Sequence, residues 1–382
     1  MKDALRAVLL PFAATRLALL LCGCLGGALL PSGLLLQKGN LVFHHTGPLP
    51  LEIAARWDAE WYLLIAERGY GADEAFVGLP VAYHKGDDSG FFPLYPLLIR
   101  AVATTGLSFL AAGVVVSNLA ALLAAALLRD LVKRDRGEEE AGRAVWLLLS
   151  FPTSFFLSVV YAESLLLAMT LLAVRLARDG RPQAAGAAAG LACLARPTGV
   201  LALIPVVLEL ARPQGDWERP VSRLRRAAMA CAGPGLALGL WAAFCHARFG
   251  EWLPFVARQE RWRGATSGPW RAFVRYFEAP QIHGAHHSTI DLVCATALVV
   301  SLVFAWRRLR RSDTLYAAAA ILLPLSSTLW SFTRFASTIY PVPMLWGRAG
   351  ATRPDRHTAI LAVFLPLAGL LTAFYAAWWW VG

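Results

Sequence analysis

A short polar and aromatic segment holds the residues best suited to chemistry. It reads Arg56-Trp57-Asp58-Ala59-Glu60-Trp61-Tyr62, within a chain that is otherwise strongly apolar. The two tryptophans favour a membrane–water interface. A carboxylate between them could serve as a general base that deprotonates an acceptor hydroxyl; the alternative is an ordinary solvated carboxylate on an interfacial helix. Glu60 and Glu67 have the same chemistry, but we expect them to face water more than Asp58 does.

Two isolated arginines form a second candidate group. Arg196 and Arg334 fall at the predicted outer ends of apolar spans, away from the other basic clusters. A charged side chain within a bilayer costs roughly 2.5–3.5 kcal/mol on insertion scales, so each needs a partner or a role. The planar guanidinium suits a phosphate group, whereas snorkelling to the headgroups is the alternative. Tyr161 and Glu163 occupy a tight outer turn, where they either line the same cavity or simply form a polar turn.

Metal binding has two candidate groups, and the sequence favours neither. His283, His286 and His287 are closely spaced, but no cysteine is near and the nearest acid, Asp291, begins a predicted span. The pair Asp87-Asp88 lacks further ligands in sequence. The chain also has no phosphate-cradling P-loop and no dinucleotide fingerprint, which argues against coupling to nucleotide hydrolysis.

Composition identifies an all-α polytopic membrane protein. Of the 382 residues, 57% are hydrophobic and only 16% are charged, against about a quarter charged in soluble domains. We expect a single membrane domain over residues 1–382 with about eleven transmembrane helices. They are predicted at 7–36, 107–128, 144–160, 162–178, 183–196, 198–211, 227–247, 290–306, 314–331, 336–347 and 358–380.

The distribution of basic residues predicts the orientation. With the N-terminus inside, the inner segments hold 22 of the 36 lysines and arginines, so the net charge of +11 reflects cytoplasmic loops rather than nucleic-acid binding. Residues 37–106 and 248–289 then form two outer loops. In the first, residues 50–68 predict one amphipathic helix in the headgroup layer, with Gly69 as its stop and Trp57 and Trp61 on one side.

The motifs resemble those of the PIG-V family of integral-membrane mannosyltransferases. The resemblance rests on Arg56-Trp57-Asp58-x-x-Trp61-Tyr62-x-x-Ile65-Ala66-x-x-Gly69-Tyr70 and on Phe91-Phe92-Pro93-Leu94-Tyr95-Pro96. Looser support comes from Ser158-x-x-Tyr161-x-Glu163-Ser164, Ala195-Arg196-Pro197-Thr198-Gly199 and Arg334-Phe335.

That resemblance implies a GT-C glycosyltransferase-type helical bundle with interfacial helices and the catalytic aspartate in the first outer loop, which here is Asp58. It implies a polyprenyl- or dolichyl-phosphate mannose donor, an acceptor hydroxyl on a glycan, glycolipid or protein, and no required metal or other cofactor. We assign the remaining site residues to substrate binding (Arg56, Trp57, Trp61, Tyr62, Tyr161, Glu163) and to the donor phosphate (Arg196, Arg334). Neutralising Asp58 on a water-facing helix should then cost well under 1 kcal/mol of stability.

Two further expectations concern location and class. The expected location is a bacterial cell membrane, or the endoplasmic reticulum membrane in a eukaryote, with the active site on the outer or lumenal face. The alternative function is a lipid-linked-sugar flippase or transporter that does no chemistry. Transporters place ionisable groups at mid-bilayer between helices, whereas this sequence places them in outer loops.

Overall fold

The computed structural model describes residues 2–33, 47–72, 86–213, 219–278, 280 and 288–381. Within these ranges every regular element is helical, which confirms the all-α class. Five helices are long and apolar enough to cross a membrane: α1 (Lys2–Leu29), α5 (Phe109–Arg136), α10 (Pro220–Phe249), α13 (Thr289–Arg308) and α17 (Pro354–Ala376). The number of eleven spans stays a prediction.

Shorter helices complete the bundle between these five. They are α4 (Leu94–Ala103), α6 (Glu138–Leu149), α7 (Glu163–Arg178), α8 (Pro182–Ala195), α9 (Leu203–Leu210), α14 (Arg311–Leu325) and α16 (Pro341–Thr352). Small residues allow some of them to approach closely. A Cβ added to Gly186 of α8 would lie 2.5 Å from the Ala230 carbonyl oxygen of α10, so only glycine permits this contact.

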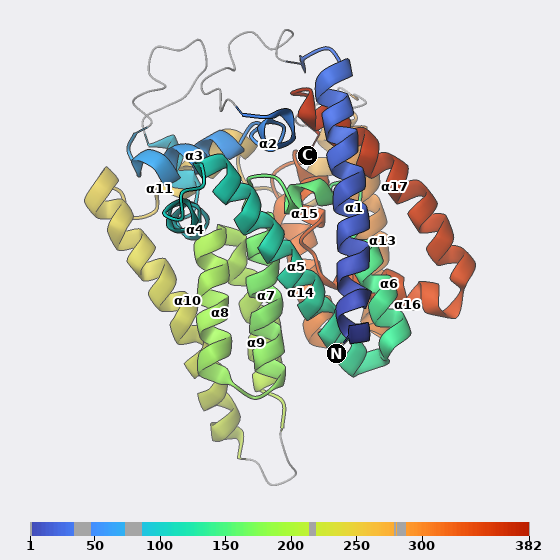
Figure 1. Ribbon diagram of the computed structural model, residues 1–382. Helices are drawn as coiled ribbons and strands as arrows, with labels where there is room; N and C mark the ends of the chain where they lie inside the picture. Colours follow the sequence, from blue (N-terminus) through green and yellow to red (C-terminus); the bar gives the residue numbers. More distant parts are fainter. Residues whose placement is uncertain are drawn as a thin grey trace.

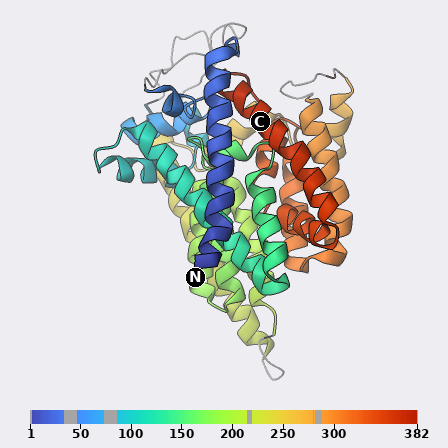
Figure 2. The same cartoon turned by 45° about the vertical axis from the view of Figure 1, so that its right-hand side comes forward.

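The chain termini mark the two ends of the bundle (Figure 1). The N-terminus lies at one end, whereas the C-terminus, α2 (Leu49–Glu52), α3 (Ala59–Arg68) and α11 (Pro254–Arg263) lie at the other. We call the second end the loop end, because it gathers described parts of both predicted outer loops. Figure 2 shows α1 running along the bundle towards this end, where Gly26 approaches the backbone of Ala373 in α17.

The predicted single helix over residues 50–68 is wrong. The segment forms two helices, α2 and α3, separated by a turn in which Trp57 has φ 60°, a left-handed conformation that ends helical geometry. Helix α3 does not expose its indole, since Trp61 is buried. The helix packs against α4 and α5, and all residues from Ala59 to Ala66 are buried. The predicted stop at Gly69 is confirmed, with φ 83° at the end of α3.

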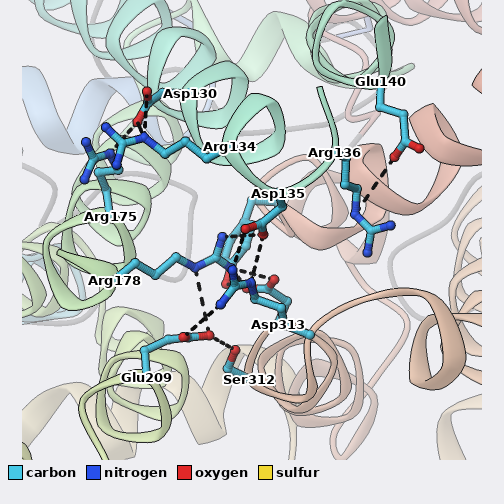
Figure 3. A network of polar contacts seen from close by, with 12 residues as sticks. Asp130, Arg134, Asp135, Arg136, Glu140, Arg175, Arg178, Glu209, Ser312 and Asp313 are labelled. Carbon is cyan, nitrogen blue, oxygen red and sulfur yellow. Dashed lines mark hydrogen bonds and ion pairs between the residues drawn. The ribbon is translucent and has the colours of Figure 1, made fainter. Parts of the chain in front are cut away.

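The opposite end of the bundle is tied together by buried charges (Figure 3). Arg178 of α7 lies between Asp313 of α14, at 2.7 Å, and Asp135 of α5, at 2.9 Å. Arg310 pairs with the same Asp135 and, at 3.3 Å, with Glu209 of α9. Because opposite charges alternate here, each buried group has a compensating neighbour. The sequence showed these residues only as part of basic inner clusters.

The arrangement predicts a definite topology. A reporter inserted after Gly137, in the turn between α5 and α6, should be active only inside the cell, because basic residues surround this end. A reporter fused after Gly382 should be active only outside. Paired alkaline phosphatase and green fluorescent protein fusions measure this, and the reverse pattern at both positions would invert the orientation.

Candidate active site

Asp58 is held at the start of α3 by two tyrosines from distant segments, one in the turn before α7 and one in α17. Its backbone N–H donates to the hydroxyl of Tyr161 at 3.1 Å. That hydroxyl in turn donates to the carbonyl oxygen of Arg56 at 3.1 Å, and Tyr375 of α17 donates to the same oxygen at 3.1 Å. The turn carrying Asp58 is thus fixed through its backbone, which leaves the carboxylate free for another interaction.

The carboxylate of Asp58 begins a chain of alternating charges. Its Oδ2 lies 2.6 Å from Nη1 of Arg334, in α15 (Phe332–Ala336). Nε of Arg334 lies 3.5 Å from Oε1 of Glu163, and the same oxygen accepts a hydrogen bond from Nη1 of Arg196 at 2.6 Å. The structure therefore brings four predicted site residues into one line, from segments up to 276 residues apart.

Exposure changes sharply along this line. The Glu163 side chain is 1% exposed and that of Arg334 7%, whereas that of Asp58 is 34% exposed. Arg334 is further enclosed by aromatic rings, with ring centroids 5.1–5.7 Å from its guanidinium carbon in Phe156, Tyr161, Phe335 and Trp380. Cation–π contacts of this kind favour a charged guanidinium. Asp58 is thus the accessible end of a buried charge chain.

The electrostatics keep Arg334 charged and Tyr62 neutral. Burial alone lowers the pKa of Arg334, but the charges of Asp58 and Glu163 outweigh this effect and the pKa is raised. Burial is also the main cause that raises the pKa of the Tyr62 phenol. Tyr62 therefore keeps its proton at neutral pH and does not compete with Asp58 as a base.

The other predicted substrate-binding residues lie around the line rather than in it. Arg56 points away: it pairs with Glu52 at 3.1 Å and donates to the carbonyl of Ala376. Trp61 stacks on Phe91 with ring centroids 5.4 Å apart, and Tyr62 meets the same ring edge-on. Trp57 is half-buried beside Asp58. The contacts of Arg56, Trp61 and Tyr62 give these three residues structural roles, and their contact with a substrate stays a prediction.

One expectation about the acidic residues is wrong. Glu60 is 5% exposed, so it does not face water more than Asp58, while Glu67 is exposed as expected. Asp87 and Asp88 are not arranged as metal ligands. Asp87 lies 2.9 Å from Nη1 of Arg261 in α11, and the carboxylate of Asp88 accepts a hydrogen bond from the Gly71 N–H. The other candidate metal site, at His283, His286 and His287, lies outside the described residues.

Several residues that shape the site were not predicted from the sequence. Trp378 and Trp380 fall in the span predicted at 358–380, but they follow the end of α17 and both contact Trp57, with ring centroids 6.1 and 5.6 Å apart. Among described non-glycine residues, positive φ angles occur at Trp57, Ser331 and Trp378. All three are close to Asp58 or Arg334 along the chain or in space, and backbone strain of this kind concentrates at functional sites.

Arg263 of α11 is a further missed residue. It donates to the Trp330 carbonyl at 3.0 Å and to Ser327 Oγ at 3.2 Å, so it holds the turn between α14 and α15. Its guanidinium lies 5.0 Å from the ring centroid of Phe335, next to Arg334. Burial, followed by the charges of Arg334 and Arg196, lowers its pKa to about 10, and Arg263 still carries its charge at neutral pH.

A pocket opens beside the charge chain. Glu163 and Arg196 form its polar side, and Thr198 of η5 (Pro197–Ala202) lies next to them. The rest of the lining is mainly apolar and comes largely from α14, α15 and the segment after it, including Tyr316, Leu323, Phe335 and Ile339. The pocket therefore places two charged side chains next to an apolar wall.

Comparison with known proteins agrees with these observations. Residues 46–209 match the model of the mannosyltransferase (PIG-V) family. Over 154 residues the chain is 33% identical to GPI alpha-1,6-mannosyltransferase 2 of Cricetulus griseus. This match covers 39% of the present chain and 30% of that protein, so the matched segment spans less than a third of the relative's length.

A solved structure extends the likeness over nearly the whole fold. ArnT from Cupriavidus metallidurans, in a structure bound to undecaprenyl phosphate, superposes with a TM-score of 0.55 at 18% identity. The superposition covers 93% of this chain and 62% of that one, and at this identity it bears on the fold alone. The resemblance to the PIG-V mannosyltransferase family that the motifs indicated is confirmed by the family match over residues 46–209.

Proposed function

We propose that this chain is a membrane-embedded mannosyltransferase with Asp58 as its general base. The observation that carries the proposal is the position of Asp58 as the one half-exposed member of the chain Asp58–Arg334–Glu163–Arg196. The donor would be a polyprenyl- or dolichyl-phosphate mannose and the acceptor a hydroxyl of a glycan, glycolipid or protein. The family match and the fold likeness to ArnT support this class of reaction.

The reaction needs a base but no strong acid. The Asp58 carboxylate takes the proton of the acceptor hydroxyl while the acceptor oxygen bonds to the anomeric carbon. The bond from that carbon to the donor phosphate breaks, and the phosphate leaves with the electron pair. Because this leaving group already carries negative charge, electrostatic stabilisation matters more than protonation. A single displacement of this kind inverts the anomeric carbon.

Arg196 and Arg334 are the groups proposed to stabilise the leaving phosphate. Within the described residues, Glu163 is the only hydrogen-bond acceptor of the Arg196 side chain, so most of its N–H groups remain for a ligand. Arg334 binds Asp58 through Nη1 and has further N–H groups towards Glu163. The pocket beside Arg196 would take the phosphate end of the donor, with its apolar wall against the first part of the lipid chain.

The protein would act as a multi-pass protein of a bacterial cell membrane, or of the endoplasmic reticulum membrane in a eukaryote, from the outer or lumenal face. We also propose that the chain crosses the membrane about eleven times. Purified protein incubated with polyprenyl-phosphate mannose and membrane lipid extract should yield a mannosylated product, identified by mass spectrometry. Donor movement across vesicle bilayers without any new glycosidic bond would favour the flippase alternative instead.

Asp58→Asn should lower turnover by about 10²–10⁴-fold, because the amide keeps the shape of the side chain but accepts no proton. The same change weakens the pair with buried Arg334, and we expect it to cost roughly 1–3 kcal/mol rather than the small cost of a surface change. Steady-state rates and thermal unfolding measure the two effects. Glu67→Gln, at an exposed carboxylate, is the control and should keep both the turnover and the stability of the wild type. An Asp58→Asn protein within tenfold of wild type would remove the base assignment.

Arg196→Ala should raise the KM for donor and lower kcat, since Arg196 is proposed to bind the donor phosphate and to stabilise it as it leaves. Arg334→Ala should lower kcat further, because Arg334 also pairs with Asp58. Lysine at either position should restore only part of the loss, since an ammonium lacks the planar fork. Initial rates at varied donor concentration separate these effects.

Arg271→Ala, at an exposed arginine of α12 (Trp270–Tyr276), is the matched control for loss of a positive charge. It should leave both constants unchanged. Wild-type constants in both site variants would mean that the phosphate is bound elsewhere, for example by Arg258, Arg261 or Arg275.

A further inference from the structure

The segment that carries Arg334 has little support of its own. Helix α15 is only five residues long, and its N-cap Ser331 adopts φ 64° with no side-chain capping hydrogen bond. The first backbone N–H groups of a helix have no partner within the helix and require one from outside. A guanidinium on so short a helix keeps its direction only if other parts of the fold hold the backbone.

Asp291 supplies that support from α13. Its side chain is 1% exposed, and its Oδ1 accepts hydrogen bonds from the Thr333 backbone N–H at 2.7 Å and from Thr333 Oγ1 at 2.6 Å. From the other side, Thr153 Oγ1 donates to the carbonyl oxygen of Thr333 at 2.8 Å. Thr333 is therefore fixed through three of its polar groups, and Arg334 is the next residue.

The chemistry of Asp291 fits this position. A carboxylate at a helix N-terminus interacts favourably with the helix dipole and with the exposed N–H groups. Asp291 thus takes the part of an N-cap residue for α15, although it belongs to a different helix. Burial of a carboxylate is costly unless hydrogen bonds compensate it, and two of its hydrogen bonds end on the residue before Arg334.

We propose that Asp291 is a positioning residue that directs the Arg334 guanidinium towards Asp58 and the donor phosphate. The inference rests on the proposed role of Arg334 as a phosphate ligand. Asp291 does not touch the substrate itself: it acts through Thr333 and the orientation of α15. A purely structural carboxylate would stabilise the bundle without any energetic coupling to Arg334.

The test measures binding of undecaprenyl phosphate to the full-length protein in detergent by isothermal titration calorimetry. Asp291→Ala should weaken binding about tenfold, or ~1.4 kcal/mol. Asp291→Asn should retain most of the affinity, because the amide oxygen still accepts both hydrogen bonds. The double variant Asp291→Ala/Arg334→Ala should bind no more weakly than Arg334→Ala alone, since residues that act through one group are not additive.

Asp313→Ala is the matched control, because Asp313 is also a buried carboxylate in the first turn of a helix but lies at the opposite end of the bundle. It should lower thermal stability and leave the affinity unchanged. If Asp291→Ala does not yield folded protein, Thr333→Val serves as a second variant. It removes the hydrogen bond from Thr333 Oγ1 to Asp291 and should also weaken binding.

Three results would overturn the inference. Wild-type affinity in Asp291→Ala or in Thr333→Val, with weakened binding in Arg334→Ala, would remove the role of Asp291 and leave the proposed phosphate clamp intact. Equal losses in Asp291→Ala and Asp313→Ala would indicate general destabilisation. Wild-type affinity in Arg334→Ala would remove both the clamp role of Arg334 and the positioning role that depends on it.

Discussion

The charge of Arg334 is the constraint on which the arrangement at the loop end depends. A buried guanidinium is strongly unfavourable unless carboxylates and hydrogen bonds compensate it. Asp58 and Glu163 provide that compensation, and they come from the start of α3 and from the start of α7. Three segments far apart in the sequence must therefore meet at one point. The aromatic rings around Arg334 exclude water and make the pairing with the two carboxylates more important.

This pairing requires an unusual backbone on both sides. Trp57 and Ser331 adopt left-handed conformations next to the turn of Asp58 and the helix of Arg334. Such conformations cost on the order of 1–3 kcal/mol each and persist only where the surroundings enforce them. Tyr161 and Tyr375 hold the first turn, whereas Arg263 and Asp291 hold the second. The partners that fix Asp58 and Arg334 are thus themselves polar groups from other parts of the fold.

The two ends of the bundle use charge differently. At the end opposite the loop end, Arg178 and Arg310 are matched by acids that are largely buried, and this network joins four helices. At the loop end the chain of charges ends in Asp58, whose carboxylate reaches solvent. Contacts within the loop end, such as that of Asp87 with Arg261, hold α11 over this region. An open carboxylate on a rigid support is what a general base requires.

The sequence alone determined the membrane class and the all-helical architecture, and it singled out the carboxylate that we propose as the base. Apolar length and the spacing of basic residues are local properties, and the motif around Asp58 is short and continuous. Only the tertiary structure decided that Arg334 pairs with Asp58 and that Glu163 bridges two arginines, because contacts over 276 residues leave no periodic signal. The helix break at Trp57 and the burial of Glu60 could not be predicted from the sequence for the same reason. The residues from 50 to 68 are compatible with one helix, and it is packing against α4, α5 and the C-terminal tryptophans that favours the turn.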